Sequence, residues 1–484
     1  MRTALALSLL LAACQAPSAA SPHGEPANAA DATFGARFTG ATLRFDYVHC
    51  GTAKEEHVAV AGFRVEGAWP GSRTQLVDDS NLGKYRFRVF DAGSDVELFS
   101  RGFASIFGEW ETTGPAKSGW GSFEESQRFP EPRAPARLVL EKRGDDGRFH
   151  ELWRGDVDPK SRFVDRSKLP RLGEVIPIRE NGPAASHVDL LVVGDGYTAE
   201  RRGQFVADVK RLTGVLLATE PFRRNADKFN VRALFVATEE SGISNPRKGV
   251  WKDGAFGLSF NAFDSDRYVL TYADRKLRDA AAQAPYDALI LLFDERKYGG
   301  GGIYNLWSTC AAASEQAPYL FVHEFGHGFA GLADEYYSSQ VAYEAFNPRG
   351  VEPWEENVTA LLDPARLKWR DLVDAGTPLP TPWGKERYDA LDLAYQKKRK
   401  ALVDAQATEE ASEALMREIG ATTAPLLAGE RFHGQVGAFE GAMYEAQGLY
   451  RPEVDCIMFT RNPTTFCKVC ERALERVIRR YVDG

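Results

Sequence analysis

The sequence predicts an α+β protein, in which an N-terminal all-β sandwich is followed by an α/β domain. Three observations lead to this fold class. Short runs that alternate apolar and polar residues fill residues 33–158, and glycine, proline and acidic clusters separate them. From residue 186 onwards, strand-like apolar runs alternate with helical patterns. A further helical segment, over residues 318–330, has apolar flanks and carries two histidines.

The N-terminus is predicted to be a targeting segment. Arg2 precedes a short apolar run from Ala4 to Ala13, and this run leads into Leu11-Ala12-Ala13-Cys14, which looks like a bacterial lipobox. Residues 1–13 are therefore predicted to be a lipoprotein signal peptide. Cys14 would then carry lipid, and the Ala-, Pro- and Ser-rich residues 14–32 would form a flexible tether. The alternative is plain secretion, with cleavage near Ala20. An apolar run this short does not span a bilayer, so membrane attachment is expected only through the lipid. The expected location is the bacterial outer membrane or cell surface, otherwise the medium or the periplasm.

The strand predictions in the N-terminal domain rest on alternation. Residues 44–48, 85–90 and 136–141 each alternate polar and apolar side chains, and no helical run of any length lies among them. A small β-sandwich over residues 33–158 is the natural interpretation. The charged and proline-containing residues 159–185 are expected to be a linker.

The second domain is predicted to span residues 186–484. Apolar runs at 188–193, 229–236 and 288–293 predict buried strands, and residues 198–217 have helical spacing. Residues 338–430 form a long insertion, in which the strongly charged stretch 389–419 is expected to be helical. A last helix is expected over 470–481.

Composition limits the class of partner. The chain has 484 residues, 44% of them hydrophobic, which is enough for two or three domains with ordinary cores. A net charge of −8 argues against nucleic acid. No obligate partner is evident, and a protein or peptide is the expected binding partner.

The segment His323-Glu-Phe-Gly-His327 predicts a metal site. Histidines four residues apart share one face of a helix, and two imidazoles so placed can bind one zinc ion. Glu324 lies beside them, where it can take a proton from a water that the metal activates. Pro318 suits the first turn of this helix and Gly331 its end. The alternative is a surface helix with solvated histidines, which the apolar flanks disfavour.

The third metal ligand is expected to be an acid beyond the helix. Asp334 lies three residues after Gly331, which is the interval between glycine and last ligand in the metzincin pattern H-E-x-x-H-x-x-G-x-x-H. Glu335 and the more distant Glu440 are alternatives. Asp334 could also be an ordinary turn residue after the helix.

These motifs together resemble the IgA-peptidase family of bacterial zinc metallopeptidases. The resemblance extends from His323–Tyr336 through Val436-Gly-Ala-Phe-Glu-Gly441 and Tyr450-Arg-Pro to Cys456-Ile-Met458. Residues 192–198 are similar to the start of that peptidase domain, and residues 43–51 are similar to the N-terminal β-domain of the family.

The resemblance implies a metzincin-like α/β zinc protease domain with one catalytic Zn²⁺. Glu324 would be the general base, His323 and His327 would be ligands, and Asp334 the third ligand. Met458 would lie in the methionine turn below the metal, and a tyrosine such as Tyr450 could help to hold the oxyanion. The implied activity is endopeptidase cleavage of extracellular proteins, among which host glycoproteins or immunoglobulins are possible substrates that no residue here encodes.

Two further segments leave alternatives open. The four glycines at 299–302 lack the G-K-[ST] of a phosphate-binding loop; in metzincin-like proteases this position is an edge strand that pairs with extended substrates, and the alternative is a mobile loop. In an exported protein, Cys467 or Cys470 is expected to form a disulfide with Cys456.

The competing function is a catalytically silent surface protein whose β-domain binds a host protein or glycan. In that hypothesis the histidine motif is a relic, which would have no need of Glu324.

Overall fold

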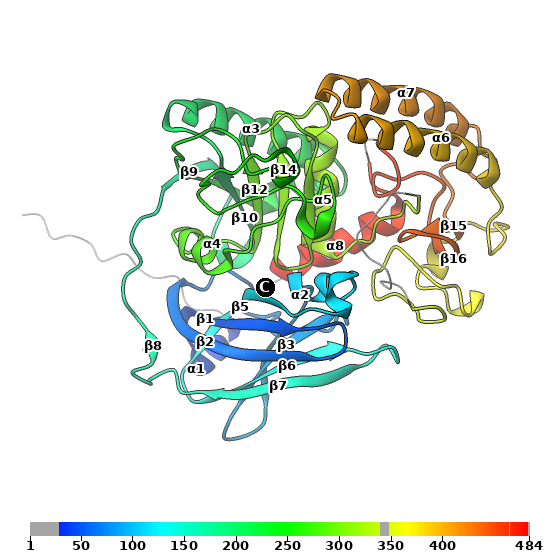
Figure 1. Ribbon diagram of the computed structural model, residues 1–484. Coiled ribbons are helices and arrows are strands. Elements are labelled where there is room, and N and C mark those ends of the chain that lie inside the picture. Colours follow the sequence, from blue (N-terminus) through cyan, green and yellow to red (C-terminus); the bar gives the residue numbers. More distant parts are fainter. Residues whose placement is uncertain (1–28, 339–347, 464, 483–484) are drawn as a thin grey trace, which may run out of the picture.

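A computed structural model describes residues 29–338, 348–463 and 465–482 of the chain. It confirms the predicted α+β class: an N-terminal β-domain lies against a larger α/β domain (Figure 1). The predictions for residues 1–28, which include the signal peptide and the lipidation of Cys14, lie outside the described residues.

The N-terminal domain consists of two four-stranded sheets, with strand orders β5-β1-β2-β8 and β4-β3-β6-β7. Alternation in β3 places Tyr85, Phe87 and Val89 in the core between the sheets, as the pattern predicts. Two helices that the sequence pattern did not indicate also lie in this part of the chain. The bounds are α1 Ala29–Arg37, β1 Phe38–Gly51, β2 Glu56–Ala68, β3 Tyr85–Asp91, β4 Glu97–Phe103, α2 Ile106–Trp110, β5 Gly121–Pro132, β6 Ala136–Arg143, β7 Phe149–Val157 and β8 Val164–Asp165.

A six-stranded sheet, in the order β13-β14-β12-β10-β11-β9, forms the centre of the second domain. Strands β14, β12, β10 and β11 are parallel, whereas β13 and β9 run antiparallel at the two edges. The three apolar runs predicted as strands are β10, β11 and β12. The bounds are β9 Glu174–Arg179, β10 Val188–Asp195, α3 Arg202–Ala218, β11 Phe229–Phe235, α4 Asp274–Ala281, β12 Ala288–Phe293, β13 Gly300–Ile303, β14 Trp307–Ala311, α5 Ala317–Ala330, β15 Phe439–Ala442, β16 Glu445–Arg451 and α8 Lys468–Val482.

Residues 159–185 do more than connect the two domains. Strand β8 pairs with β2 of the N-terminal domain, and β9 pairs with β11 of the central sheet. The segment therefore adds one strand to each domain, which its charged composition did not indicate.

The charged stretch predicted as one helix over 389–419 is a pair of helices, α6 (Lys385–Asp404) and α7 (Glu409–Ala428). The break follows from local signals: Gln406 has a left-handed φ of 48°, and the Thr408 side chain caps α7 by accepting from the Ala411 amide. The two helices lie together at one end of the molecule (Figure 1). Within the described ranges, no helix combines the length and apolarity needed to cross a bilayer.

Polar contacts join the two domains. Arg44 forms an ion pair with Asp279 at 2.6 Å, and the Ser126 hydroxyl donates to Asp274 of α4 at 2.7 Å. The Arg128 guanidinium lies 3.6 Å from the ring centre of Tyr286. These buried contacts hold the β-domain against the α/β domain, so that α2 reaches the cleft described below.

Candidate metal centre

Helix α5 carries the histidine motif and has the predicted ends. Pro318 lies in its first turn, and the chain leaves it at Gly331, which has a left-handed φ of 62°. A side chain at this position would be strained by the backbone conformation, and its Cβ would lie 2.7 Å from the Trp354 ring. The turn reverses the chain and returns Asp334 to the helix.

The three predicted ligands converge on one point. The Nε2 atoms of His323 and His327 lie 3.1 Å apart, and Asp334 Oδ1 lies 3.1 Å and 3.2 Å from them. All three side chains are largely buried, and together they form a group able to hold a metal ion.

The outer nitrogens of the two imidazoles explain why this group fits a cation. His323 Nδ1 lies 3.0 Å from the Ile457 carbonyl oxygen, and His327 Nδ1 lies close to the Leu332 carbonyl oxygen. Because a carbonyl can only accept, each Nδ1 donates its proton, so an Nε2 that has no proton of its own turns a lone pair inward. Two such lone pairs and a carboxylate oxygen in contact repel one another unless a proton or a metal cation lies between them. The donor set therefore suits zinc.

Electrostatics within the group favour the ionised acid. Burial alone would raise the pKa of Asp334, but the two imidazoles beside it hold this pKa well below its ordinary value. Burial lowers the pKa of His327, yet the charge of Asp334 outweighs it and raises this pKa to about 9. The site thus presents a carboxylate to any cation that enters.

Glu324 is half-buried and follows His323 on the helix. Burial raises the pKa of its carboxyl group, and the charges of His323 and His327 oppose that shift. Among the described residues none forms a hydrogen bond with the Glu324 carboxylate, which leaves its oxygens available to a water molecule.

The other two candidate third ligands lie elsewhere. Glu335 turns away from the histidines towards Cys470, and Glu440 accepts from the Gly448 amide at 3.2 Å. Of the three acids considered, only Asp334 lies against both imidazoles.

Met458 lies below the histidine helix. Its side chain is fully buried, and a Cβ added at Gly326 of α5 would lie 3.2 Å from its sulfur. Its carbonyl accepts from the Glu335 amide at 2.9 Å. The same turn thus supports His323, through the Ile457 carbonyl, and the segment that carries Asp334.

Sequence reasoning missed a tyrosine at the site. The Tyr444 hydroxyl donates to Asp334 Oδ2, from the turn between β15 and β16. Tyr336 also faces the group, with its ring stacked 6.4 Å from that of His323. Tyr450, the expected oxyanion tyrosine, does not line the cleft, whereas Tyr336 and Tyr444 do. No spacing rule marked Tyr444, because only the β15–β16 hairpin brings it to α5.

A cleft of about 240 Å³ opens over the histidines. Strand β13 forms one wall, so the glycine run is an edge strand and not a loop. A Cβ at Gly302 would lie 2.4 Å from the Glu324 carbonyl oxygen and 2.7 Å from His327 Cβ. The backbone that approaches the glycine is therefore that of α5. Further walls come from both domains and from the helix pair, including Glu109, Trp354, Tyr395 and Met416.

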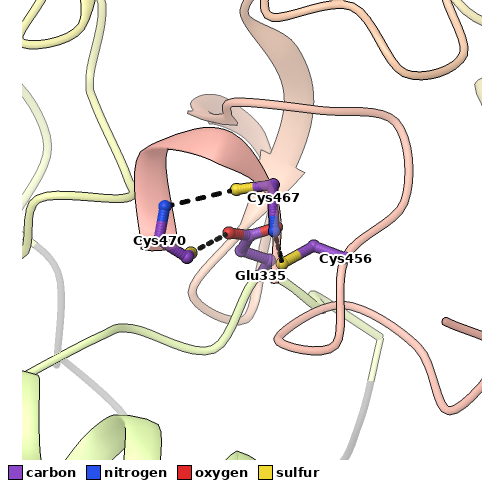
Figure 2. A group of neighbouring side chains, drawn as sticks. All are labelled: Glu335, Cys456, Cys467 and Cys470. Carbon is purple, nitrogen blue, oxygen red and sulfur yellow. Dashed lines mark hydrogen bonds between the residues drawn. The ribbon is translucent and has the colours of Figure 1, made fainter. Parts of the chain in front are cut away.

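The expected disulfide is absent. Cys456, Cys467 and Cys470 are buried and lie side by side, but all are free thiols, as are Cys50 and Cys310. The three clustered cysteines surround Glu335 (Figure 2).

Two protein-family models match the chain. The one described as IgA Peptidase M64 matches residues 176–478, and the one described as Peptidase M64 N-terminus matches residues 33–154. No curated protein matches the chain. The first range covers the central sheet and the histidine helix, and the second covers the β-domain.

Proposed function

Because the chain belongs to the IgA peptidase M64 family and is therefore a peptidase, we propose that it is a zinc-dependent endopeptidase acting on extracellular proteins. One observation supports this proposal above all. His323 Nε2, His327 Nε2 and Asp334 Oδ1 meet within 3.2 Å of one another, with Glu324 beside them in an open cleft.

His323, His327 and Asp334 would hold the zinc ion and leave one position open, as a catalytic site requires. When bound, zinc would supply a Lewis acid that lowers the pKa of a water molecule and polarises the scissile carbonyl. The Ile457 and Leu332 carbonyls would keep the imidazoles in the ligating tautomer.

Glu324 would act as general base and then as general acid. It would take the proton of the attacking water and deliver it to the leaving amine. A pKa raised by burial suits this role, because a proton once taken is held long enough to be passed on. Tyr444 would orient Asp334 through their hydrogen bond.

Strand β13 would bind the substrate backbone. The Gly300 amide donates outward to the Arg267 carbonyl at 3.2 Å, and its carbonyl accepts from the Val269 amide at 3.3 Å. In an antiparallel ladder every second residue directs its backbone groups to the same side of the strand, so the amide and carbonyl of Gly302 face away from β14, as those of Gly300 do. An extended peptide could pair there, next to the histidines.

Export and lipid anchoring at Cys14 belong to the same proposal. They rest on the lipobox-like Leu11-Ala12-Ala13-Cys14 and would place the active site where extracellular proteins are the substrates.

Glu324→Gln tests the proposal directly. The variant keeps the size of the side chain and removes the base, so it should retain zinc and lose chelator-sensitive cleavage of denatured casein by about 10²–10⁴-fold. Glu239→Gln, at an exposed acid outside the cleft, is the matched control and should be fully active. His323→Gln should lose the zinc ion of the histidine site together with the activity. Retained turnover in Glu324→Gln, or cleavage that resists chelators, would contradict the proposal.

A further inference from the structure

Glu335, Cys456, Cys467 and Cys470 form a second group of metal-ligand side chains. Their ligand atoms all lie within 4.8 Å of one another, and all four residues are buried (Figure 2). We propose that this group binds a second, structural zinc ion, separate from the ion held by the histidines.

The thiols are arranged as zinc ligands. Cys467 and Cys470 have the C-x₂-C spacing of structural zinc sites and lie at the start of α8, where backbone amides favour thiolates. The Cys467 amide donates to Cys456 Sγ at 3.2 Å, and the Cys470 amide donates to Cys467 Sγ at 3.5 Å. On metal binding the three thiols would ligate as thiolates and release their protons to solvent.

Glu335 independently points to a bound cation. Its side chain is 0% exposed, and Oε1 accepts from the Asn357 amide group at 3.0 Å. Oε2 has no hydrogen-bond partner in the described part of the chain. Arg451, also buried, donates its terminal nitrogens to backbone carbonyls such as that of Gly441, at 2.8 Å. Glu335 Oε1 also accepts from the Cys470 thiol at 3.3 Å. Burying a carboxylate with one oxygen unpaired has a cost in free energy, and a metal ion bound to Oε2 would offset it.

A disulfide explains less of this arrangement. Any bridge among three cysteines leaves one thiol over, and it leaves Oε2 of the buried Glu335 carboxylate without a hydrogen-bond partner among the described residues. A tetrahedral ion uses all four ligands at once. Three thiolates favour zinc over magnesium or calcium, and four protein ligands close the site to substrate, which makes it structural.

The proposed zinc site would hold two segments that position the histidine site. Glu335 directly follows Asp334, and Cys456 directly precedes Ile457, whose carbonyl accepts from His323. One ion would therefore tie the segment of the third ligand, the methionine turn and α8 together. Its loss should also weaken metal binding at the histidine site.

The test counts metal in the full mature chain. Wild type should carry about two zinc ions by elemental analysis, and His323→Gln/His327→Gln should keep one. X-ray absorption of that double variant should show sulfur ligands at about 2.3 Å. Adding Cys470→Ser to the double variant should remove the remaining ion. Adding Cys310→Ser instead, at a buried cysteine outside the group, should not.

A double variant without zinc, or peptide mapping that finds a disulfide among the three cysteines, would overturn the proposal. If the variant with Cys470→Ser fails to fold, the zinc content of the His323→Gln/His327→Gln variant still tests the proposal, because that variant keeps all the cysteines. The two proposals fail separately: the His323→Gln/His327→Gln variant reports on the sulfur-bound ion without the histidine site, and Glu324→Gln reports on catalysis with every metal ligand in place.

Discussion

Gly302→Ala would separate strand β13 from the histidine helix. The added Cβ would lie 2.4 Å from the Glu324 carbonyl oxygen, whereas ordinary van der Waals contact begins at 3.4 Å. The strand must therefore move by about 1 Å, because the opposing atoms belong to a helix backbone that cannot rotate away. His327 Cβ, at 2.7 Å, blocks the alternative of a sideways shift.

Two losses follow from that displacement. Overpacking of this kind costs about 1–3 kcal/mol of folding free energy. The strand is also the wall that would align the substrate, and a misplacement of about 1 Å can lower turnover by about 10²-fold. Zinc content should stay unchanged, because none of the three ligands lies on β13.

The assay compares thermal unfolding, zinc content and casein cleavage in three proteins: wild type, Gly302→Ala and Gly62→Ala. Gly62 lies in strand β2, and a Cβ there meets nothing within 4 Å, so this control should match wild type. If Gly302→Ala unfolds at the wild-type temperature and turns over at the wild-type rate, the close approach of β13 to α5 is refuted.

Two other predictions concern side-chain hydrogen bonds. Tyr444→Phe removes the hydroxyl that donates to Asp334 and should weaken zinc binding by about 10–100-fold. Competition with a chromophoric chelator measures the affinity. An unchanged affinity would mean that this hydrogen bond does not orient Asp334. His49 is buried between Glu125 at 2.9 Å and Glu56 at 2.7 Å; burial lowers its pKa, but these acids outweigh burial and raise it to about 9. The pKa of histidine in the unfolded chain is about 6.5, so below that pH His49→Gln should lower the free energy of unfolding by up to about 3 kcal/mol. This loss should disappear as the pH rises through 9. Urea unfolding at several pH values measures it, and a difference that does not change with pH would contradict the ion pairs.

Much of the fold could be predicted from local patterns. The apolar runs that became β10, β11 and β12 are long enough to be buried strands, and alternation placed Tyr85 and its neighbours in the sandwich core. The composition of the charged insertion does not indicate the break between α6 and α7, because this break depends on one capping threonine inside a uniformly helical composition. The composition of residues 159–185 predicts a linker and does not indicate strands β8 and β9, because short edge strands are defined by the strands they pair with and not by their own composition.

The sequence by itself determined the placement of His323, Glu324 and His327, because the period of an α-helix fixes which side chains of one turn face the same way. It also determined the end of that helix, since only a glycine such as Gly331 takes a left-handed turn without strain. The tertiary structure alone decided that Tyr444 reaches Asp334 and that Glu335 joins cysteines more than 100 residues away. Contacts between segments so distant in the chain follow from the packing of the whole domain, which no local spacing encodes.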